Sequence, residues 1–567
     1  MVGTPQPRPG AKPPFGGIDR EELTTMDPEC WQTMLVWSGY DRRHPSESKD
    51  IIEGIVHGMD IGFTGDREVN RESKNLSSAL ESEEVENKVN ELIMENVRAG
   101  KTAGPFTRRP FKYFSYSPIG AVPKAVHGRE WRPTDVRVIH HLSHPFGGDS
   151  INNQSVDIPC CLGSVDAAAN SIRRLGKNCW LTKIDIKAAY KLVPVRFEDW
   201  SLLGFKWRGN FFYERTLPFG LKSSCRQWEL YSTAMHDFLL TLVGVEEVDH
   251  YVDDFFLADQ LESDAIEHLR MTIGLFDRLG IPIAHDKTIS PTRRLTYLGV
   301  ELDSATLTMR LSESKLIQLR QLLQDWNGKQ SANQTELQSL CGKLNWACAV
   351  IRPGRSFLRR IIDHTKVAGH GEGTIIPISV RLDIKWWSDC ASEYNGVSIM
   401  YDIEWTSSTK LHLFTDACNT GYGASFGNRW ICGSWTAAEL CTAQRGNKQD
   451  RYSMPYLELR SLTLALASWG HLLSGKNVEI HCDCLPIVQS IEKRSCREGR
   501  AMDLIRAIHT IAARHRFDFK ASHVRGVDNV LADALSRNNI PLFHFHQRSA
   551  NPKQDPTLPI PAPIKLN

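Results

Sequence analysis

The sequence predicts an α+β protein with two parts of mixed strands and helices and a mainly helical segment between them. In residues 81–310, short apolar strands alternate with amphipathic helices. Residues 311–400 keep the apolar spacing that is typical of helices, and strands return in residues 405–545, where helices follow them. A chain of 567 residues is long enough for several domains of roughly 100–200 residues each.

The two ends of the chain lack these patterns. Residues 1–80 are predicted to form a partly disordered N-terminal extension, with a Pro/Gly-rich start at 1–18, a short helical region at 19–63 and a polar linker at 64–80. Residues 546–567 contain five prolines and no periodicity, which predicts a Pro-rich tail or a linker.

Composition and charge limit the class of protein without identifying a partner. The chain has 41% hydrophobic residues, 24% charged residues and a mean hydropathy of −0.33, as globular proteins do. It has no apolar signal segment and no apolar run near the roughly 18 residues that span a bilayer, which predicts an intracellular protein of the cytoplasm or nucleus without a membrane partner. Basic residues gather at 98–137, where they form either a solvated face or a phosphate track.

The cysteines do not indicate a disulfide framework or a zinc site. Fourteen cysteines are few for a chain of this length, and free thiols in a reducing compartment are expected. Cys482 and Cys484 flank Asp483 in an apolar stretch. We therefore expect both thiols in a buried strand rather than among metal ligands.

A first group of carboxylates follows apolar strands. Asp185 ends one strand, and Asp253 and Asp254 lie between two apolar stretches, which predicts a β-hairpin with the acids at its turn. Charged groups are rarely buried in such a hairpin unless they are paired or bind metal. Asp185 and Asp253 are therefore candidate metal ligands, and Asp254 is expected to contribute less directly because side chains alternate along a strand. Adjacent acids in a turn also occur by chance.

A second group of carboxylates lies in the last third of the chain. Asp416 ends an apolar strand, Glu458 lies on a predicted helix, Asp483 ends another strand, and Asp533 lies on a final helix. Two-metal phosphoryl transfer requires carboxylates that converge from separate chain segments. Both groups fit this requirement.

The first part of the chain resembles the reverse transcriptase family through six motifs in the family's order. These motifs are "PIGAVPKAVHGREWRPTDVRVIHHLS", "DIKAAY", "LPFGLKSS", "YVDD", "GIPIAHDKT" and "YLGVEL". The resemblance implies an RNA-directed DNA polymerase that also copies DNA, with a right-hand fold of fingers, palm and thumb. It also implies that residues 311–400 form the thumb and connection, and that "YLGVEL" is the primer grip.

The resemblance implies roles for several further residues. Lys124 and Arg137 stand where the family contacts the incoming triphosphate, and Lys287 where it protonates the leaving pyrophosphate. Phe219 and Gly220 belong to the motif that packs under the nucleotide and template. Phe219 departs from the polar residue of some retroviral enzymes, and Phe at this position is found in retroelement relatives.

Tyr190 is a candidate for the residue that selects the sugar. It lies five positions after Asp185, where the family carries an aromatic ring that crowds the 2′ position of the nucleotide. The resemblance therefore implies exclusion of ribonucleotides. An ordinary core tyrosine is the alternative.

The last part of the chain resembles the ribonuclease H of retroelements. The order of Asp416, Glu458, Asp483 and Asp533 and the ending "NVLADALSR" carry this resemblance. It implies a mixed α/β sheet with three antiparallel strands first. It also implies a mobile histidine that assists product release, for which His523 has the family's spacing; an exposed loop histidine is the alternative.

Together the resemblances imply a retroelement enzyme with two nucleic-acid sites. Each site is expected to hold two Mg²⁺ ions, with Mn²⁺ as a substitute, and Asp254 is included among the acids of the first site. The partners implied are an RNA template, a DNA primer, the RNA–DNA hybrid and dNTPs. The segments "IIEGIVHGMDIGF" and "RVIHHLSHPFGGDSINN" resemble DIRS-type elements, which implies a recombinase encoded in the same element. A catalytically inactive relic and a domesticated host polymerase remain as alternatives.

Overall fold

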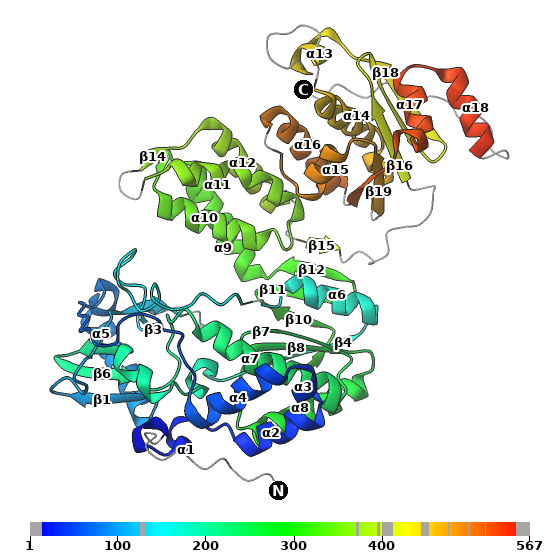
Figure 1. Ribbon diagram of the computed structural model, residues 1–567. Helices are drawn as coiled ribbons and strands as arrows, with labels where there is room; N and C mark the ends of the chain where they lie inside the picture. The colour runs from blue at the N-terminus through cyan, green and yellow to red at the C-terminus, as the bar shows by residue number, and fades with distance from the viewer. Residues whose placement is uncertain are drawn as a thin grey trace. The chain divides into compact units, whose positions relative to one another are not determined.

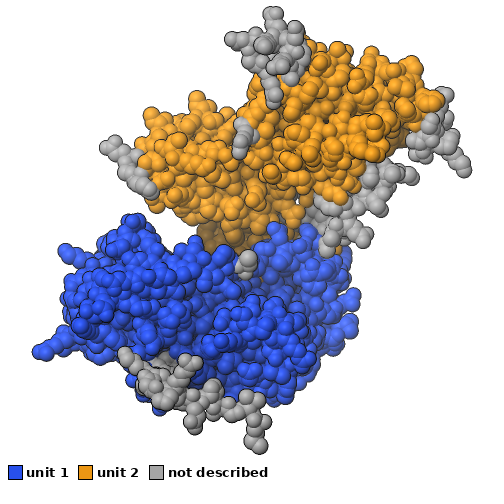
Figure 2. All heavy atoms as spheres, in the orientation of Figure 1, with its two compact units in different colours: residues 1–295 blue, residues 296–567 orange. Residues whose placement is uncertain are grey.

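The chain forms two compact units in the computed structural model, Met1–Leu295 and Thr296–Asn567, which Figure 2 colours separately. Figure 1 labels their helices and strands. The structure describes residues 14–124, 132–160, 162–369, 373–393, 397–399, 412–443, 453–474, 476–496, 498–515 and 517–550.

Unit 1 is built on a four-stranded antiparallel sheet with the strand order β7-β8-β4-β9. Its strands are β4 (Trp180–Asp185), β7 (Glu247–Tyr251), β8 (Asp254–Asp259) and β9 (Ile289–Thr292). The helices that pack against it are α6 (Val165–Leu175), α7 (Ser224–Phe238) and α8 (Glu262–Leu279). The tight turn between β7 and β8 is the predicted hairpin, and it places Val252 at a φ of 58°.

The segment predicted as an N-terminal extension is part of the core of unit 1. Helices α2 (Pro28–Trp37) and α4 (Pro45–His57) contact α7. Trp31 is fully buried and packs edge-on against Tyr231, 5.4 Å between ring centroids. The prediction of a separate extension is therefore wrong for the described part, because the apolar faces of these helices complete the core. The Pro/Gly-rich residues 1–13 lie outside the described residues.

A second layer of unit 1 surrounds a smaller apolar core. It contains the sheet β1-β6-β5, the hairpin β2–β3 and helix α5. The predicted amphipathic helix is confirmed as α5, which buries Val85, Val89 and Ile93. The bounds are α5 (Glu83–Arg98), β1 (Thr102–Phe106), β2 (Ile119–Pro123), β3 (Val136–His140), β5 (Gly204–Trp207) and β6 (Asn210–Glu214).

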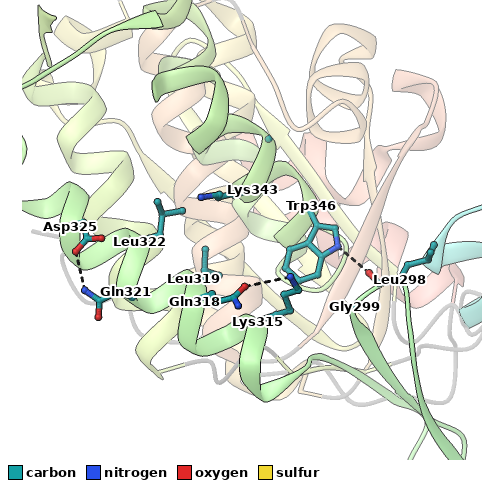
Figure 3. A pocket seen from close by; sticks show the side chains of 11 residues that line it. Leu298, Gly299, Lys315, Gln318, Leu319, Gln321, Leu322, Asp325, Lys343 and Trp346 are labelled. Atoms are coloured by element: carbon teal, nitrogen blue, oxygen red, sulfur yellow. Dashed lines mark hydrogen bonds between the residues drawn. The ribbon is translucent and has the colours of Figure 1, made fainter. Parts of the chain in front are cut away.

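The first part of unit 2 is mainly helical, as predicted. Its helices are α9 (Glu313–Asn327), α10 (Gln334–Ala347), α11 (Arg359–Val367) and α12 (Ile378–Glu393). Its sheet contains β10 (Arg294–Tyr297), β11 (Val300–Asp303), β12 (Thr308–Leu311) and β15 (Val397–Ile399). A cavity of about 760 Å³ lies between α9, α10 and the turn before β11, and Trp346 Nε1 donates a 3.2 Å hydrogen bond there to the Leu298 carbonyl (Figure 3).

The second part of unit 2 contains a mixed five-stranded sheet, β18-β17-β16-β19-β20. The first three strands are antiparallel, and β19 and β20 continue the sheet in parallel, which confirms the predicted arrangement. The strands are β16 (His412–Ala417), β17 (Gly421–Phe426), β18 (Arg429–Ser434), β19 (Asn477–Cys482) and β20 (Asp518–His523). The helices are α13 (Ala437–Ala443), α14 (Met454–Trp469), α15 (Leu485–Glu492), α16 (Gly499–His515), α17 (Val530–Ser536) and α18 (Ile540–Ala550).

The C-terminal end differs in part from its prediction. Helix α18 continues to Ala550, so the predicted tail of 546–567 begins inside a helix. Residues 551–567 lie outside the described residues. Among the helices that the structure describes, none is both long and apolar enough to cross a membrane.

Candidate active sites

The first site lies where β4 meets the hairpin of β7 and β8. Asp185 at the end of β4 pairs in register with Asp254 at the start of β8. Asp253 occupies the turn before β8, and its carbonyl accepts a 2.9 Å hydrogen bond from the Ile186 amide. The antiparallel pairing therefore brings all three predicted acids to one edge of the sheet. Asp185 and Asp253 line a cavity of about 980 Å³, whereas Asp254 is not among its lining residues.

Two lysines of the chain accompany these acids. Lys287 Nζ lies 3.0 Å from Asp185 Oδ1, and Lys183 Nζ lies 2.9 Å from Asp254 Oδ1. Burial and the neighbouring charge of Asp254 raise the pKa of Asp253. Burial acts to lower the pKa of Lys287, but its hydrogen bond with Asp185 and the surrounding acids raise it overall, which keeps the ammonium charged. The first site thus carries part of its own counter-charge.

The predicted nucleotide-contacting residues line the same cavity, with one exception. Lys124, Arg137, Tyr190 and Phe219 are lining residues. The Arg137 guanidinium lies 4.9 Å from the centroid of the Phe219 ring, and the Tyr190 ring lies 5.2 Å from it. These three side chains therefore form one aromatic and cationic wall.

Gly220 is the exception. It has a φ of +107°, and a Cβ placed there would come within 2.0 Å of the His140 carbonyl oxygen. Its carbonyl accepts a 2.8 Å hydrogen bond from the Asn152 side chain. Gly220 therefore allows its own backbone segment to lie close to the backbone of β3. It does not line the cavity.

Sequence reasoning missed two features beside Tyr190. Lys191 forms a 2.8 Å ion pair with Glu214, and both line the cavity. Cys160 and Cys225 face each other with 3.7 Å between their sulfur atoms. Burial and the neighbouring Cys225 thiol raise the pKa of Tyr190. The sequence offered one signal for Cys225, because "SSC" at 223–225 replaces the small-residue/Pro ending that is more usual in the family's motif.

The second site lies on the five-stranded sheet of unit 2. Asp416 is on β16, and Asp483 directly follows β19, the parallel neighbour of β16. Glu458 comes from α14, which packs on β16, and Asp533 comes from α17, which packs on β16 and β17. All four predicted acids therefore come to one end of the sheet.

The charges of these acids act on one another. Burial raises the pKa of Asp416 to about 6, and the charges of Asp483 and Asp533 add to the effect. Burial raises the pKa of Glu458 to about 9, with contributions from Asp416 and Asp483. Asp416 and Glu458 are only 4% and 5% exposed. A buried group of carboxyls with raised pKa values is the donor set that a divalent cation would ionise.

The rim of the second site carries the remaining polar partners. Arg537 Nε donates a 2.8 Å hydrogen bond to Asp533 Oδ1, and the Ser536 hydroxyl donates one of 2.5 Å to Asp416. His523 is exposed, and its Nε2 lies 3.1 Å from the Asp483 carbonyl oxygen. His523 is thus placed at the mouth of the site.

Cys482 lies beside the predicted metal ligands of the second site. It lies in a buried strand as expected, with 1% exposure. However, ligand atoms of Glu458, Cys482 and Asp483 all lie within 4.8 Å of one another, so this thiol is among groups that could hold a metal ion. The last strand residue thus turns its side chain toward α14, beside the predicted metal ligands. Cys484 lies outside the strand and is half-buried, so the expectation of a buried strand is wrong for this residue.

The fold and the two acid clusters define a nucleic-acid polymerase followed by a nuclease-like domain. Residues 122–302 match the family model described as "Reverse transcriptase (RNA-dependent DNA polymerase)", and residues 406–509 match "RNase H-like domain found in reverse transcriptase". The chain therefore carries a reverse transcriptase domain and an RNase H-like domain. The predicted fold class, a right-hand polymerase followed by an α/β ribonuclease H-like domain, is confirmed.

Relatives of the chain include retrotransposon polyproteins. The transposon Tf2-3 and Tf2-4 polyproteins of Schizosaccharomyces pombe are each 22% identical over 369 residues, which is 63% of this chain and 25% of the polyprotein. The chain thus spans about a quarter of the length of these relatives. A structure of the foamy viral protease-reverse transcriptase dRH in complex with double-stranded DNA is 13% identical, covers 92% of this chain and 84% of that one, and has a TM-score of 0.47.

Proposed function

We propose that the chain copies RNA into DNA, accepts DNA templates as well, and cleaves the RNA strand of the hybrid that it makes. The observation that carries this proposal is the presence of two separate carboxylate clusters. One lies within the matched polymerase domain; the other has Asp416, Glu458 and Asp483 within the RNase H-like match and Asp533 beyond its end. A polymerase that reads RNA leaves an RNA–DNA hybrid, and a nuclease that removes the RNA strand frees the DNA for second-strand synthesis.

In the polymerase, we assign metal binding to Asp185 and Asp253, with Asp254 in support. At both sites, a bound divalent metal would activate the attacking oxygen and neutralise the charge that develops on the phosphate. Mg²⁺ suits all-oxygen donor sets of this kind, and Mn²⁺ is the expected substitute.

The side chains around the polymerase cavity have the remaining roles. Lys124 and Arg137 bind the triphosphate of the incoming dNTP through charge-assisted hydrogen bonds. Lys287 carries a proton at Nζ, close to Asp185, and donates it to the leaving pyrophosphate. The ring of Tyr190 occupies the space that a 2′-hydroxyl would need, with Phe219 packed behind it.

In the nuclease, Asp416, Glu458, Asp483 and Asp533 would hold the metal, which would supply activation of the attacking water. His523, at the mouth of the site, assists departure of the cleaved phosphate.

The RNA template and DNA primer are gripped through their phosphates and duplex shape. Lys315, Lys343 and Trp346 line the pocket beside the predicted primer grip and are suited to this contact (Figure 3).

The setting of the enzyme is also a proposal. We infer an intracellular enzyme of the cytoplasm or nucleus that belongs to a DIRS-type element, with a recombinase encoded in the same element. The motifs around residues 51–63 and 137–153 support this subclass. We also propose 81–310, 311–400 and 405–545 as the bounds of the fingers and palm, the thumb and connection, and the nuclease domain, with the helices of 19–63 added to the first of these by their packing on α7.

The test is primer extension on an RNA template and on a DNA template, each with dNTPs or NTPs and Mg²⁺. The parent chain should extend primers on both templates with dNTPs only, and Asp253→Asn should not. Extension by this variant at the parent's rate would refute the site. Binding of the hybrid without turnover at any metal concentration would instead favour a catalytically inactive or domesticated relic.

A further inference from the structure

A thiol lies beside the carboxylates of the RNase H-like domain. Cys482 Sγ is 3.9 Å from Glu458 Oε2, and Asp483 follows Cys482 directly. Glu458 is 5% exposed and has no ion pair with lysine or arginine within the described part of unit 2. A carboxyl buried to this extent without a protein cation stays protonated until a bound cation replaces the proton, so Glu458 is available as a ligand.

The donor set differs from one made for Mg²⁺ alone. Mg²⁺ takes oxygen ligands, whereas thiolates select softer ions such as Zn²⁺ and Cd²⁺. Zn²⁺ binds a thiolate at about 2.3 Å and a carboxylate oxygen at about 2.0–2.2 Å, so neighbouring ligand atoms on one tetrahedral ion lie about 3.5 Å apart. The 3.9 Å between Cys482 and Glu458 needs only a small adjustment to reach that spacing.

We propose that Glu458, Cys482 and Asp483 form a binding site for a thiophilic divalent cation, Zn²⁺ or Cd²⁺, which overlaps the Mg²⁺ site and blocks the nuclease. The blocking effect rests on the proposed nuclease function; the binding site does not. Binding breaks the S–H bond of Cys482, the sulfur electron pair forms the metal–sulfur bond, and the proton passes to solvent. Among the described residues, the acids of the polymerase site have no thiol in such a group, so polymerisation should be spared.

The test is a Cd²⁺ titration of the full chain, monitored by the ultraviolet absorbance band of the sulfur-to-cadmium charge transfer. The part of this absorbance that appears at the lowest Cd²⁺ concentrations should be absent in Cys482→Ser. It should persist in Cys484→Ser, the matched control, because Cys484 is half-buried two residues away and outside the group. Glu458→Gln should weaken Cd²⁺ binding by about tenfold or more while the thiol remains.

Competition in the parent chain tests the overlap without any substitution. Excess Mg²⁺ should shift the Cd²⁺ titration to higher concentrations, because both ions use Glu458 and Asp483. A band of unchanged affinity in Cys482→Ser would overturn the proposal. A band that requires Cys482 but has the same Cd²⁺ affinity with excess Mg²⁺ and in Glu458→Gln would also overturn the proposal, because that result would show Cd²⁺ bound by the thiol alone. Thermal melting of each variant in Mg²⁺ checks its folding.

Activity then separates the two proposals. Zn²⁺ or Cd²⁺ should stop hybrid cleavage in the parent at concentrations that leave primer extension running. Cleavage in Mg²⁺ that resists these ions would refute the overlapping site and leave the nuclease function intact. If the chain binds Cd²⁺ as expected but does not cleave the hybrid under any condition, the nuclease function is refuted and the proposed cation site stands.

Discussion

The two acid clusters differ in how their negative charge is balanced. In unit 1, Lys287 pairs with Asp185 and Lys183 pairs with Asp254, each within about 3 Å. In unit 2, Arg537 pairs with Asp533 at the rim and its charge also acts to lower the pKa of Asp416, while no lysine or arginine among the described residues forms an ion pair with Glu458.

This difference implies two ways of preparing a metal site. In the polymerase cluster, lysines already lie beside Asp185 and Asp254, so the metal displaces or joins existing cations. The nuclease cluster holds Glu458 protonated at neutral pH, because its pKa is raised to about 9. Metal binding there must release a proton, and the stability of the domain should depend more strongly on metal and on pH.

The largest expected effect separates the clusters completely. Asp483→Asn should lower hybrid cleavage by about a thousandfold, which corresponds to ~4 kcal/mol of metal stabilisation at 1.36 kcal/mol per tenfold, and should spare primer extension. Asp253→Asn should have the opposite pattern. The activity that each variant retains shows that the variant is folded. Loss of both activities in either variant would contradict the independence of the two sites.

The next effect concerns the pH dependence of unit 2. The folded pKa values of Asp416 and Glu458 lie above their ordinary values of 3.8 and 4.5, so these groups favour folding at low pH. That contribution is lost as pH rises through about 6 and about 9. With a chelator present, Glu458→Gln should therefore be more stable than the parent by roughly 2–4 kcal/mol at pH 8 and nearly equal to it at pH 4.

Thermal or denaturant unfolding between pH 4 and 9 measures the difference in stability between the parent and Glu458→Gln. Saturating Mg²⁺ should remove most of it, because the ion compensates the ionised Glu458 in the parent. Equal stability of parent and variant at every pH in chelator would contradict the uncompensated cluster.

The acids of both sites could be predicted from the sequence because each lies in a short motif with its own strand or helix. Asp185, Asp253 and Asp416 follow apolar strands, and their convergence needs only the order of the elements. Cys482 could not be predicted in the same way. Alternation along a strand places it in the core, and only the packing of α14 on β16 shows that Glu458 lies beside it.

Two further differences arise from contacts between residues distant in the sequence. Gly220 was predicted to contact substrate, yet the backbone of His140 lies against it and explains the glycine. The helices within residues 19–63 were predicted, but not their burial against α7, because an amphipathic pattern does not say which surface covers it. Periodicity finds elements, and the identity of their partners requires the fold.

A smaller effect tests the lysine of the polymerase cluster. Lys287→Ala should lower the rate of nucleotide addition by about 10- to 100-fold, since it removes a proton donor and the cation beside Asp185. Lys287→Arg keeps the positive charge but is a weaker proton donor. Compared with Lys287→Ala, it should therefore return the Mg²⁺ affinity toward the parent's value more than it returns the rate of nucleotide addition. Single-nucleotide incorporation over a range of Mg²⁺ concentrations and pH distinguishes the two roles; equal rates in all three proteins would remove Lys287 from the mechanism.

The smallest effect is expected at the arginine of the nuclease rim. Asp533 on α17 forms an ion pair with Arg537, which directly follows this helix, and the arginine side chain is 63% exposed. Exposed pairs of this kind contribute little, so Arg537→Ala should change the Mg²⁺ concentration for half-maximal hybrid cleavage by about twofold or less. Lys287→Ala should change the corresponding value for primer extension by more than that. A larger shift in Arg537→Ala than in Lys287→Ala would mean that the nuclease, like the polymerase, relies on a protein cation, and the contrast between the two clusters would be lost.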